Sequence, residues 1–290
     1  MTMNNKLRAQ NASTLNDTAD RLDPADNFNR SSHRKKWLPF KLLLMICLIA
    51  VAHSTQAALV GNFRFNGNLQ DETGNHNGEL RDPAQTLRFE PGKSADALRV
   101  DSPETSVECA NPTTFELSQD FTIAAWVKTT EEGEVLVVYK GPKFNYVAKS
   151  RQFELYGGGG LGGNGIFMHT GDSGAYGTSF LTSHSITVND DQWHHVAVTY
   201  SASNTPHFTL FVDGIGKVGT DPGLMIFGPD FVMQPDGTDA DQVLRIGGRD
   251  EAGSYTTFVG LLDEVQFYDQ TLRRDQVKFL FDNPGEVIRP

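Results

Sequence analysis

The carboxylate of Asp263 has the setting in this sequence that most suggests chemistry. It lies in a strand-like run, where the alternation of a strand puts it on one face with Leu261, Val265 and Phe267. Because that face is apolar, the carboxylate needs hydrogen bonds or a cation. One interpretation is a structural Ca²⁺ ion held by Asp263 and by Asp71 or carbonyls of the turn before it, since calcium prefers oxygen ligands. The alternative is a carboxylate hydrogen-bonded to backbone or to His195.

Patterns typical of catalysis are not found in the sequence. Retaining glycosidases hold two carboxyl groups about 5 Å apart, and on a strand this requires a spacing such as Glu-x-Asp-x-x-Glu, which does not occur here. His194 and His195 are adjacent, so on a strand they point to opposite faces and cannot chelate one ion together. We therefore expect no catalytic residues and a packed, hydrogen-bonded His195 beside Trp193.

Aromatic side chains near turns are the candidates for ligand contact, because sugars commonly stack on exposed rings. For each of them, packing at a strand end is the alternative interpretation. Two neighbouring segments are also candidates, the glycine-rich stretch 157–165 and the long connection 219–242. The candidate aromatic residues are Phe144, Tyr146, Tyr156, Tyr176 and Tyr255.

The elements that must position these residues are short strands. Apolar runs of four to eight residues, separated by turns, follow one another from Leu59 onward. Asp213-Gly214 is typical of a tight hairpin turn. This pattern predicts an all-β, antiparallel two-sheet jelly-roll sandwich. The main expected strands span residues 121–128, 135–139, 152–156, 166–169, 193–200, 207–212, 243–246 and 258–268.

One short helix is expected near the C-terminus. Its apolar stripe comprises Leu272, Val277, Leu280 and Phe281, with Gln276 on the same side, and Pro284-Gly285 would end it. Arg273 stands where a helix prefers Ser, Thr or Asp, so the predicted N-terminal cap is poor.

The N-terminal region is typical of export. Basic residues up to Lys41 precede an apolar run over residues 42–52, and small residues follow it. The run is too short to span a bilayer, which takes about 20 residues. We therefore expect residues 1–57 to be an N-terminal extension with a signal peptide, cleaved near Ala57, and residues 58–290 to be one domain. The predicted location is secreted, periplasmic or in the cell envelope, without a stable membrane anchor; a retained segment is the alternative.

The net charge limits the classes of binding partner, and the cysteine content limits disulfide formation. The chain has 25 Lys and Arg against 36 Asp and Glu, and removal of residues 1–57 leaves 17 against 32. So acidic a surface repels nucleic acid, while neutral sugars, proteins and divalent cations remain possible partners. Only Cys109 remains after cleavage, so we expect a buried thiol and no internal disulfide.

Several stretches, in order, resemble the laminin-G-like jelly-roll family within the concanavalin A-like lectin/glucanase superfamily. The resemblance implies the jelly-roll fold, with a calcium ion where the first and last strands meet. The resemblance does not fix the function; together with the missing catalytic patterns, it leads to the hypothesis of a non-catalytic recognition module that binds a carbohydrate or an extracellular protein. A structural or adhesive envelope protein and a polysaccharide-degrading enzyme are the alternatives. The stretches are 63–75, 121–127, 139–141, 193–200, 210–214, 244–247 and 258–268.

Overall fold

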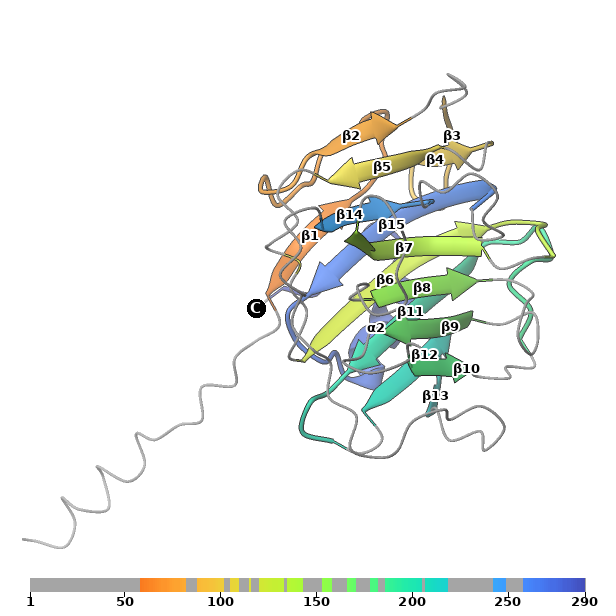
Figure 1. The fold of residues 1–290 in the computed structure, drawn as a ribbon. Helices are drawn as coiled ribbons and strands as arrows, with labels where there is room; N and C mark the ends of the chain where they lie inside the picture. The colour runs from red at the N-terminus through yellow and green to blue at the C-terminus, as the bar shows by residue number, and fades with distance from the viewer. Residues whose placement is uncertain are drawn as a thin grey trace, which may run out of the picture. The chain divides into compact units, whose positions relative to one another are not determined.

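The computed structural model separates the chain into two units, Met1–His53 and Ser54–Pro290, and every described residue lies in the second. The second unit is an all-β sandwich with one described helix, as the sequence predicts (Figure 1). Within the described residues, no helix is long and apolar enough to cross a membrane. The described residues are 58–81, 88–101, 105–109, 115, 120–132, 135–142, 153–157, 166–170, 178–181, 186–204, 207–218, 242–248 and 258–289.

The first sheet, sheet A, is antiparallel and has the order β13-β12-β11-β6-β15-β4-β3. Strand β1 pairs with the second half of β15, while β4 pairs with its first half. The first and last strands of the domain are therefore neighbours. The strands are β1 (Leu59–Phe63), β3 (Arg88–Pro91), β4 (Asp96–Val100), β6 (Phe121–Lys128), β11 (His194–Tyr200), β12 (Phe208–Val212), β13 (Ile215–Val218) and β15 (Gly260–Tyr268).

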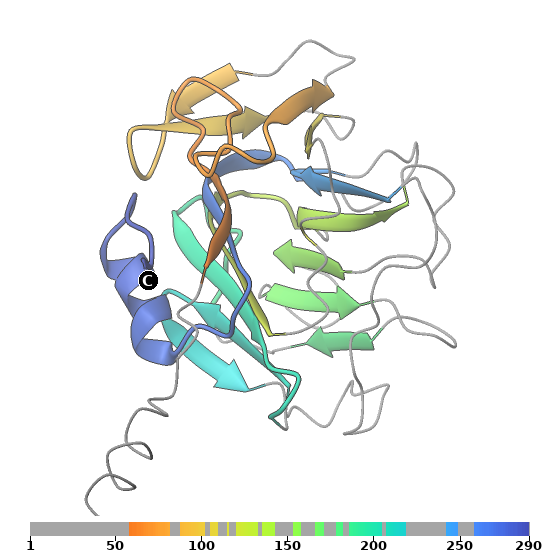
Figure 2. The ribbon, with the colours of Figure 1, turned by 90° about the vertical axis from the view of Figure 1, so that its left-hand side faces the viewer.

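The second sheet, sheet B, is also antiparallel and has the order β10-β9-β8-β7-β14-β5-β2. It faces sheet A across the sandwich (Figure 2). Its strands are β2 (Gly78–Arg81), β5 (Ser106–Cys109), β7 (Val135–Pro142), β8 (Phe153–Gly157), β9 (Ile166–Thr170), β10 (Thr178–Leu181) and β14 (Gln242–Ile246).

The main core lies between the sheets and follows the alternation of the strands. On β6, the core takes Phe121, Ile123, Ala125 and Val127, whereas Trp126 lies on the opposite face. Sheet B supplies the thiol-bearing Cys109 along with aliphatic side chains, and this cysteine is buried as expected.

A second apolar layer covers the outer face of sheet A, where helix α2 (Arg274–Asp282) packs (Figure 2). The predicted stripe is confirmed, because Leu272, Val277 and Leu280 pack against this face and Phe281 stacks on Trp126. The expected poor cap holds only in part: the Arg273 side chain makes no capping hydrogen bond, but Gln276 Oε1 accepts from the Arg273 amide at 2.9 Å.

The hairpin predicted at Asp213-Gly214 joins β12 to β13. Both residues have positive φ, 51° and 73°, as a two-residue turn of this type requires. The Asp213 carboxylate also accepts from the backbone amide of His195 at 2.9 Å, which ties the turn to β11. The turn is therefore fixed by its own residues and by the strand beside it.

Candidate functional site

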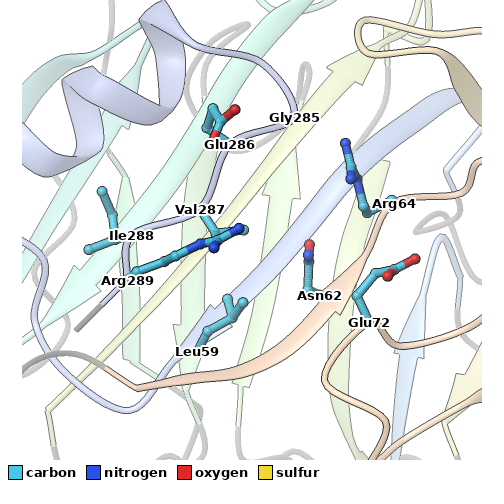
Figure 3. A pocket seen from close by; sticks show the side chains of 9 residues that line it. All are labelled: Leu59, Asn62, Arg64, Glu72, Gly285, Glu286, Val287, Ile288 and Arg289. Atoms are coloured by element: carbon cyan, nitrogen blue, oxygen red, sulfur yellow. The ribbon is translucent and has the colours of Figure 1, made fainter.

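A hollow of about 330 Å³ opens on the outer face of sheet A, between β1 and the segment that follows α2. Figure 3 shows that residues of β1 and the segment after it stand on one side, with the C-terminal segment on the other. The volume is at the lower end of the range for ligand sites, which suits one small ring. The lining residues are Leu59, Asn62, Arg64, Glu72, Gly285, Glu286, Val287, Ile288 and Arg289.

The register of β1 with β15 determines which residues of this segment line the hollow. Phe63 opposes Val265 and packs in the main core, so its neighbours Asn62 and Arg64 project from the outer face. Asp71 holds this strand in place by accepting from the Asn62 amide at 2.8 Å. The same turn brings Glu72 to the rim, where its amide donates to the Asn62 carbonyl at 2.9 Å.

The opposite wall is the C-terminal segment, held by side chains of β15. Gln266 Nε2 donates to the Glu286 carbonyl at 2.9 Å, and the Ile288 amide donates to Tyr268 Oη at 3.1 Å. Tyr268 Oη in turn donates to Gln266 Oε1 at 2.7 Å. Sequence reasoning gave this segment no role, because only the sheet pairing shows what lies beneath it.

The hollow offers both hydrogen-bond donors and acceptors. Arg64 and Arg289 balance Glu72 and Glu286 in formal charge, so the lining is close to neutral. Asn62 is only 5% exposed, and within the described part of the chain no group donates to its Oδ1. Oδ1 itself is enclosed, so Nδ2, which donates to no described group, is the side-chain atom of Asn62 left to contact a ligand or a water molecule in the hollow.

Behind Arg64 lies the buried carboxylate of Glu264. Arg64 Nε donates to Glu264 Oε1 at 3.2 Å, while no described group donates to Oε2. Burial raises the pKa of Glu264, although the guanidinium of Arg64 opposes the shift. Glu264 also has φ 47°, a left-handed conformation that a non-glycine residue rarely adopts within a strand. Such conformations concentrate at functional sites and β-bulges.

The predicted face of Asp263 is right for Leu261 but wrong for Val265 and Phe267. Leu262 packs in the main core, so Asp263 lies on the outer face opposite Trp126 of β6. A bulge between Asp263 and Gln266 shifts the register and returns Val265 and Phe267 to the core. An inserted residue of this kind reverses the facing of everything after it.

Asp263 is hydrogen-bonded to backbone, as the alternative interpretation has it. Its Oδ2 accepts from the amides of Lys93 and Ser94 at 2.8 and 2.9 Å, but no described group donates to Oδ1. Burial raises the pKa of Asp263 to about 7, the two amides oppose this, and the neighbouring charge of Glu264 adds to it.

Asp71, the other expected calcium ligand, is saturated with donors. Its oxygens accept from the amides of Asn62 and Thr73, from Thr73 Oγ1, and from His76 Nδ1 at 3.0 Å. Burial alone would raise the pKa of Asp71, but these hydrogen bonds outweigh it and the pKa is lowered. Asp263 Oδ1 therefore fits a cation better than Asp71 does, and calcium stays a prediction. In the described part of the chain, no three His, Cys, Asp or Glu residues form a metal-binding group.

The two adjacent histidines differ in their partners. His194 lies between two carboxylates, Nδ1 at 2.8 Å from Asp213 and Nε2 at 3.0 Å from Asp190, and the hydrogen bond to Asp213 leads in raising its pKa. His195 is buried edge-on against Trp126, and burial lowers its pKa to about 4. The predicted packing of His195 is confirmed, with Trp126 as its neighbour, but the predicted hydrogen bond is not: no described group is bonded to its Nδ1.

Comparison with protein families identifies the domain. The model of the concanavalin A-like lectin/glucanases superfamily, Laminin_G_3, matches residues 101–278, more than half of the chain. The chain belongs to this superfamily. None of the curated proteins matches it.

Solved structures of low identity share the superfamily fold with this chain. Domain 4 of AbnA, an extracellular arabinanase from Geobacillus stearothermophilus solved with arabinotriose, has a TM-score of 0.56 at 20% identity, over 78% of this chain and 98% of that one. The receptor binding domain of botulinum neurotoxin C/D mosaic serotype has 0.53 at 14% identity, over 77% and 51%. A Trypanosoma rangeli sialidase has 0.51 at 16% identity, over 77% and 32%.

The described residues do not test the aromatic residues that were predicted to contact a ligand. Tyr156 lies in β8, opposite Leu136 of β7 and Phe167 of β9. The other four, Phe144, Tyr146, Tyr176 and Tyr255, lie outside the described residues. Contact between these five residues and a ligand therefore stays a prediction.

Proposed function

We propose that this domain is a non-catalytic carbohydrate-recognition module. The observation that carries the proposal is the polar hollow beside β1, whose mixed donors and acceptors match the hydroxyls of a sugar. Ligand sites are typically concave and contain a few convergent polar groups that fix the ligand's orientation. The hollow also stands on rigid elements, since β15 positions both of its walls.

The solved structure with arabinotriose supports this proposal by analogy. This chain covers almost the whole of that arabinanase domain, so the likeness concerns one complete module. A fold alone does not establish a ligand, because jelly rolls serve many functions. The receptor binding domains of botulinum neurotoxins make a protein partner the second candidate.

We also propose that the protein is exported and cleaved after Ala57. The first described residue, Ala58, already belongs to the folded domain, because its amide donates to Asp269 Oδ1 at 2.9 Å and its carbonyl accepts from the Asp269 amide at 3.1 Å. After cleavage at this point, the new α-amino group would carry a positive charge beside that carboxylate. Mass spectrometry of the exported protein tests the site; a mature chain that begins within β1 would contradict it.

Affinity electrophoresis of the full chain in gels containing neutral polysaccharides tests the recognition function. Retardation in arabinan, xylan or glucan, without release of reducing sugar, is the expected result. Release of reducing sugar would contradict a non-catalytic module. Unchanged mobility in every gel, together with capture of an extracellular protein, would favour the second candidate.

A further inference from the structure

The side chain of Asn62 is the feature of the hollow that best defines its ligand. The residue is 5% exposed, lines the hollow, and has an Oδ1 that accepts from no described group. Only its backbone takes part in hydrogen bonds, through the amide to Asp71 Oδ1 and the carbonyl from the Glu72 amide. The strand is therefore held without the Asn62 side chain, which leaves that side chain free to contact a ligand.

Two guanidinium groups line the hollow together with Asn62. Arg64 uses Nε for Glu264, and its Nη2 approaches Gly285, where an added Cβ would lie 3.1 Å away. Arg289 comes from the opposite wall and extends toward Asn62 (Figure 3). A ligand group in the hollow meets donors on Asn62 Nδ2 and the two guanidinium groups, and acceptors on Glu72 and Glu286.

A hydroxyl group can bond to both kinds of group, since it has one proton and two lone pairs. A carboxylate has no proton to donate to Glu72 or Glu286, and its negative charge would be repelled by theirs. An ammonium group has no lone pair for Arg64 and Arg289. The chemistry of the hollow thus favours an uncharged, hydroxylated ligand over an acidic or basic one.

We propose that the hollow between β1 and the C-terminal segment binds one unit of a neutral sugar, whose hydroxyls accept from Asn62 Nδ2, Arg64 and Arg289 and donate to Glu72 or Glu286. This assignment rests on the proposed carbohydrate-recognition function and names its site and its ligand class. The residues named as the lining of the hollow include none of the aromatic residues that sequence reasoning selected.

The test compares Asn62→Leu with wild type and with Asn75→Leu in the full chain. Asn75 is a matched control, because it is exposed and its side chain makes only a long contact of 3.4 Å with Thr73 Oγ1. Isothermal titration calorimetry uses arabinotriose, xylotriose and maltotriose as neutral probes and trigalacturonate as the acidic probe. Thermal unfolding without sugar is measured on the same samples.

We expect wild type and Asn75→Leu to bind at least one neutral trisaccharide alike, and Asn62→Leu to bind it at least tenfold more weakly. The unfolding midpoint of Asn62→Leu should be equal or higher, because an apolar side chain of similar shape leaves no acceptor unsatisfied. Trigalacturonate should bind at least tenfold more weakly than the neutral probe.

Each opposite outcome contradicts a different statement. If wild type binds no trisaccharide, the recognition function itself fails. If wild type binds and Asn62→Leu binds equally well, the function stands but the hollow is not the site. Stronger binding of trigalacturonate overturns the neutral ligand class. Should Asn62→Leu fail to fold, Arg289→Ala repeats the test from the exposed wall, and unchanged affinity there also contradicts the site.

Discussion

Replacing Asp263 by Asn should change how the stability of the domain depends on pH. Burial raises the pKa of Asp263 from 3.8 to about 7. Between these values the folded state binds more protons at this site than the unfolded state does, so wild-type stability falls as the pH rises. Each unit of pKa difference corresponds to about 1.4 kcal/mol, and a shift of about three units sets a ceiling of about 4 kcal/mol.

The free energy of unfolding of Asp263→Asn, minus that of wild type, should therefore increase by up to about 4 kcal/mol between pH 4 and pH 8. Urea unfolding at each pH, followed by tryptophan fluorescence, measures this difference. Trp126 is a suitable reporter, because it lies opposite Asp263 in the sheet. A chelator is present throughout, since a bound cation would favour the charged carboxylate and remove the effect.

Asp96→Asn is the control, because Asp96 is an exposed carboxylate on β4 of the same sheet. Its stability difference from wild type should stay nearly constant over the same pH range. Equal pH profiles for wild type and Asp263→Asn would refute the reasoning. They would mean that the unpartnered Oδ1 of Asp263 is solvated well enough to keep its ordinary acidity.

Three further predictions concern buried polar groups. Excess Ca²⁺ should raise the unfolding midpoint relative to chelator, and Asp263→Ala should remove the rise; equal midpoints for wild type in the two conditions would rule the ion out. Asp213 raises the pKa of His194. The ion pair between protonated His194 and Asp213 therefore contributes its full stabilisation below pH 6.5 and loses it as the pH rises through the raised pKa. Asp213→Asn should thus lower the free energy of unfolding by about 1–2 kcal/mol more at pH 5.5 than at pH 9, measured by urea unfolding. An equal loss at both pH values would contradict this prediction. Burial raises the pKa of the Cys109 thiol, so Ellman's reagent should label it only after unfolding; rapid labelling of the native protein would be inconsistent with its burial.

The fold could be predicted because its signals are local. Alternation along β6 placed Phe121 and Ile123 in the core, and Asp213-Gly214 specified its own turn geometry. The stripe through Leu272 and Leu280 likewise identified the helix and its buried face. Each of these patterns depends on residues only a few positions apart, which is the range over which sequence reasoning works.

The site could not be predicted because it depends on pairing between distant segments. Alternation assumes an uninterrupted strand, and the bulge at Glu264 breaks it, so Asp263 was assigned to the wrong face. The hollow arises from contacts such as Arg64 with Glu264 and Gln266 with the Glu286 carbonyl. Asn62 gives no sequence signal, because its unsatisfied acceptor is defined only by what surrounds it.

Nuclear magnetic resonance of the side-chain amide of Asn62 during titration with arabinotriose tests the central claim most directly. Comparison of wild type with Asn62→Leu identifies the Asn62 signal, and the amide of Asn75 is the internal reference. The account predicts a saturable shift of the Asn62 amide, with little change at Asn75. A saturable response elsewhere in the protein that leaves the Asn62 amide unmoved would contradict recognition in the hollow, and no response anywhere would contradict recognition of this sugar.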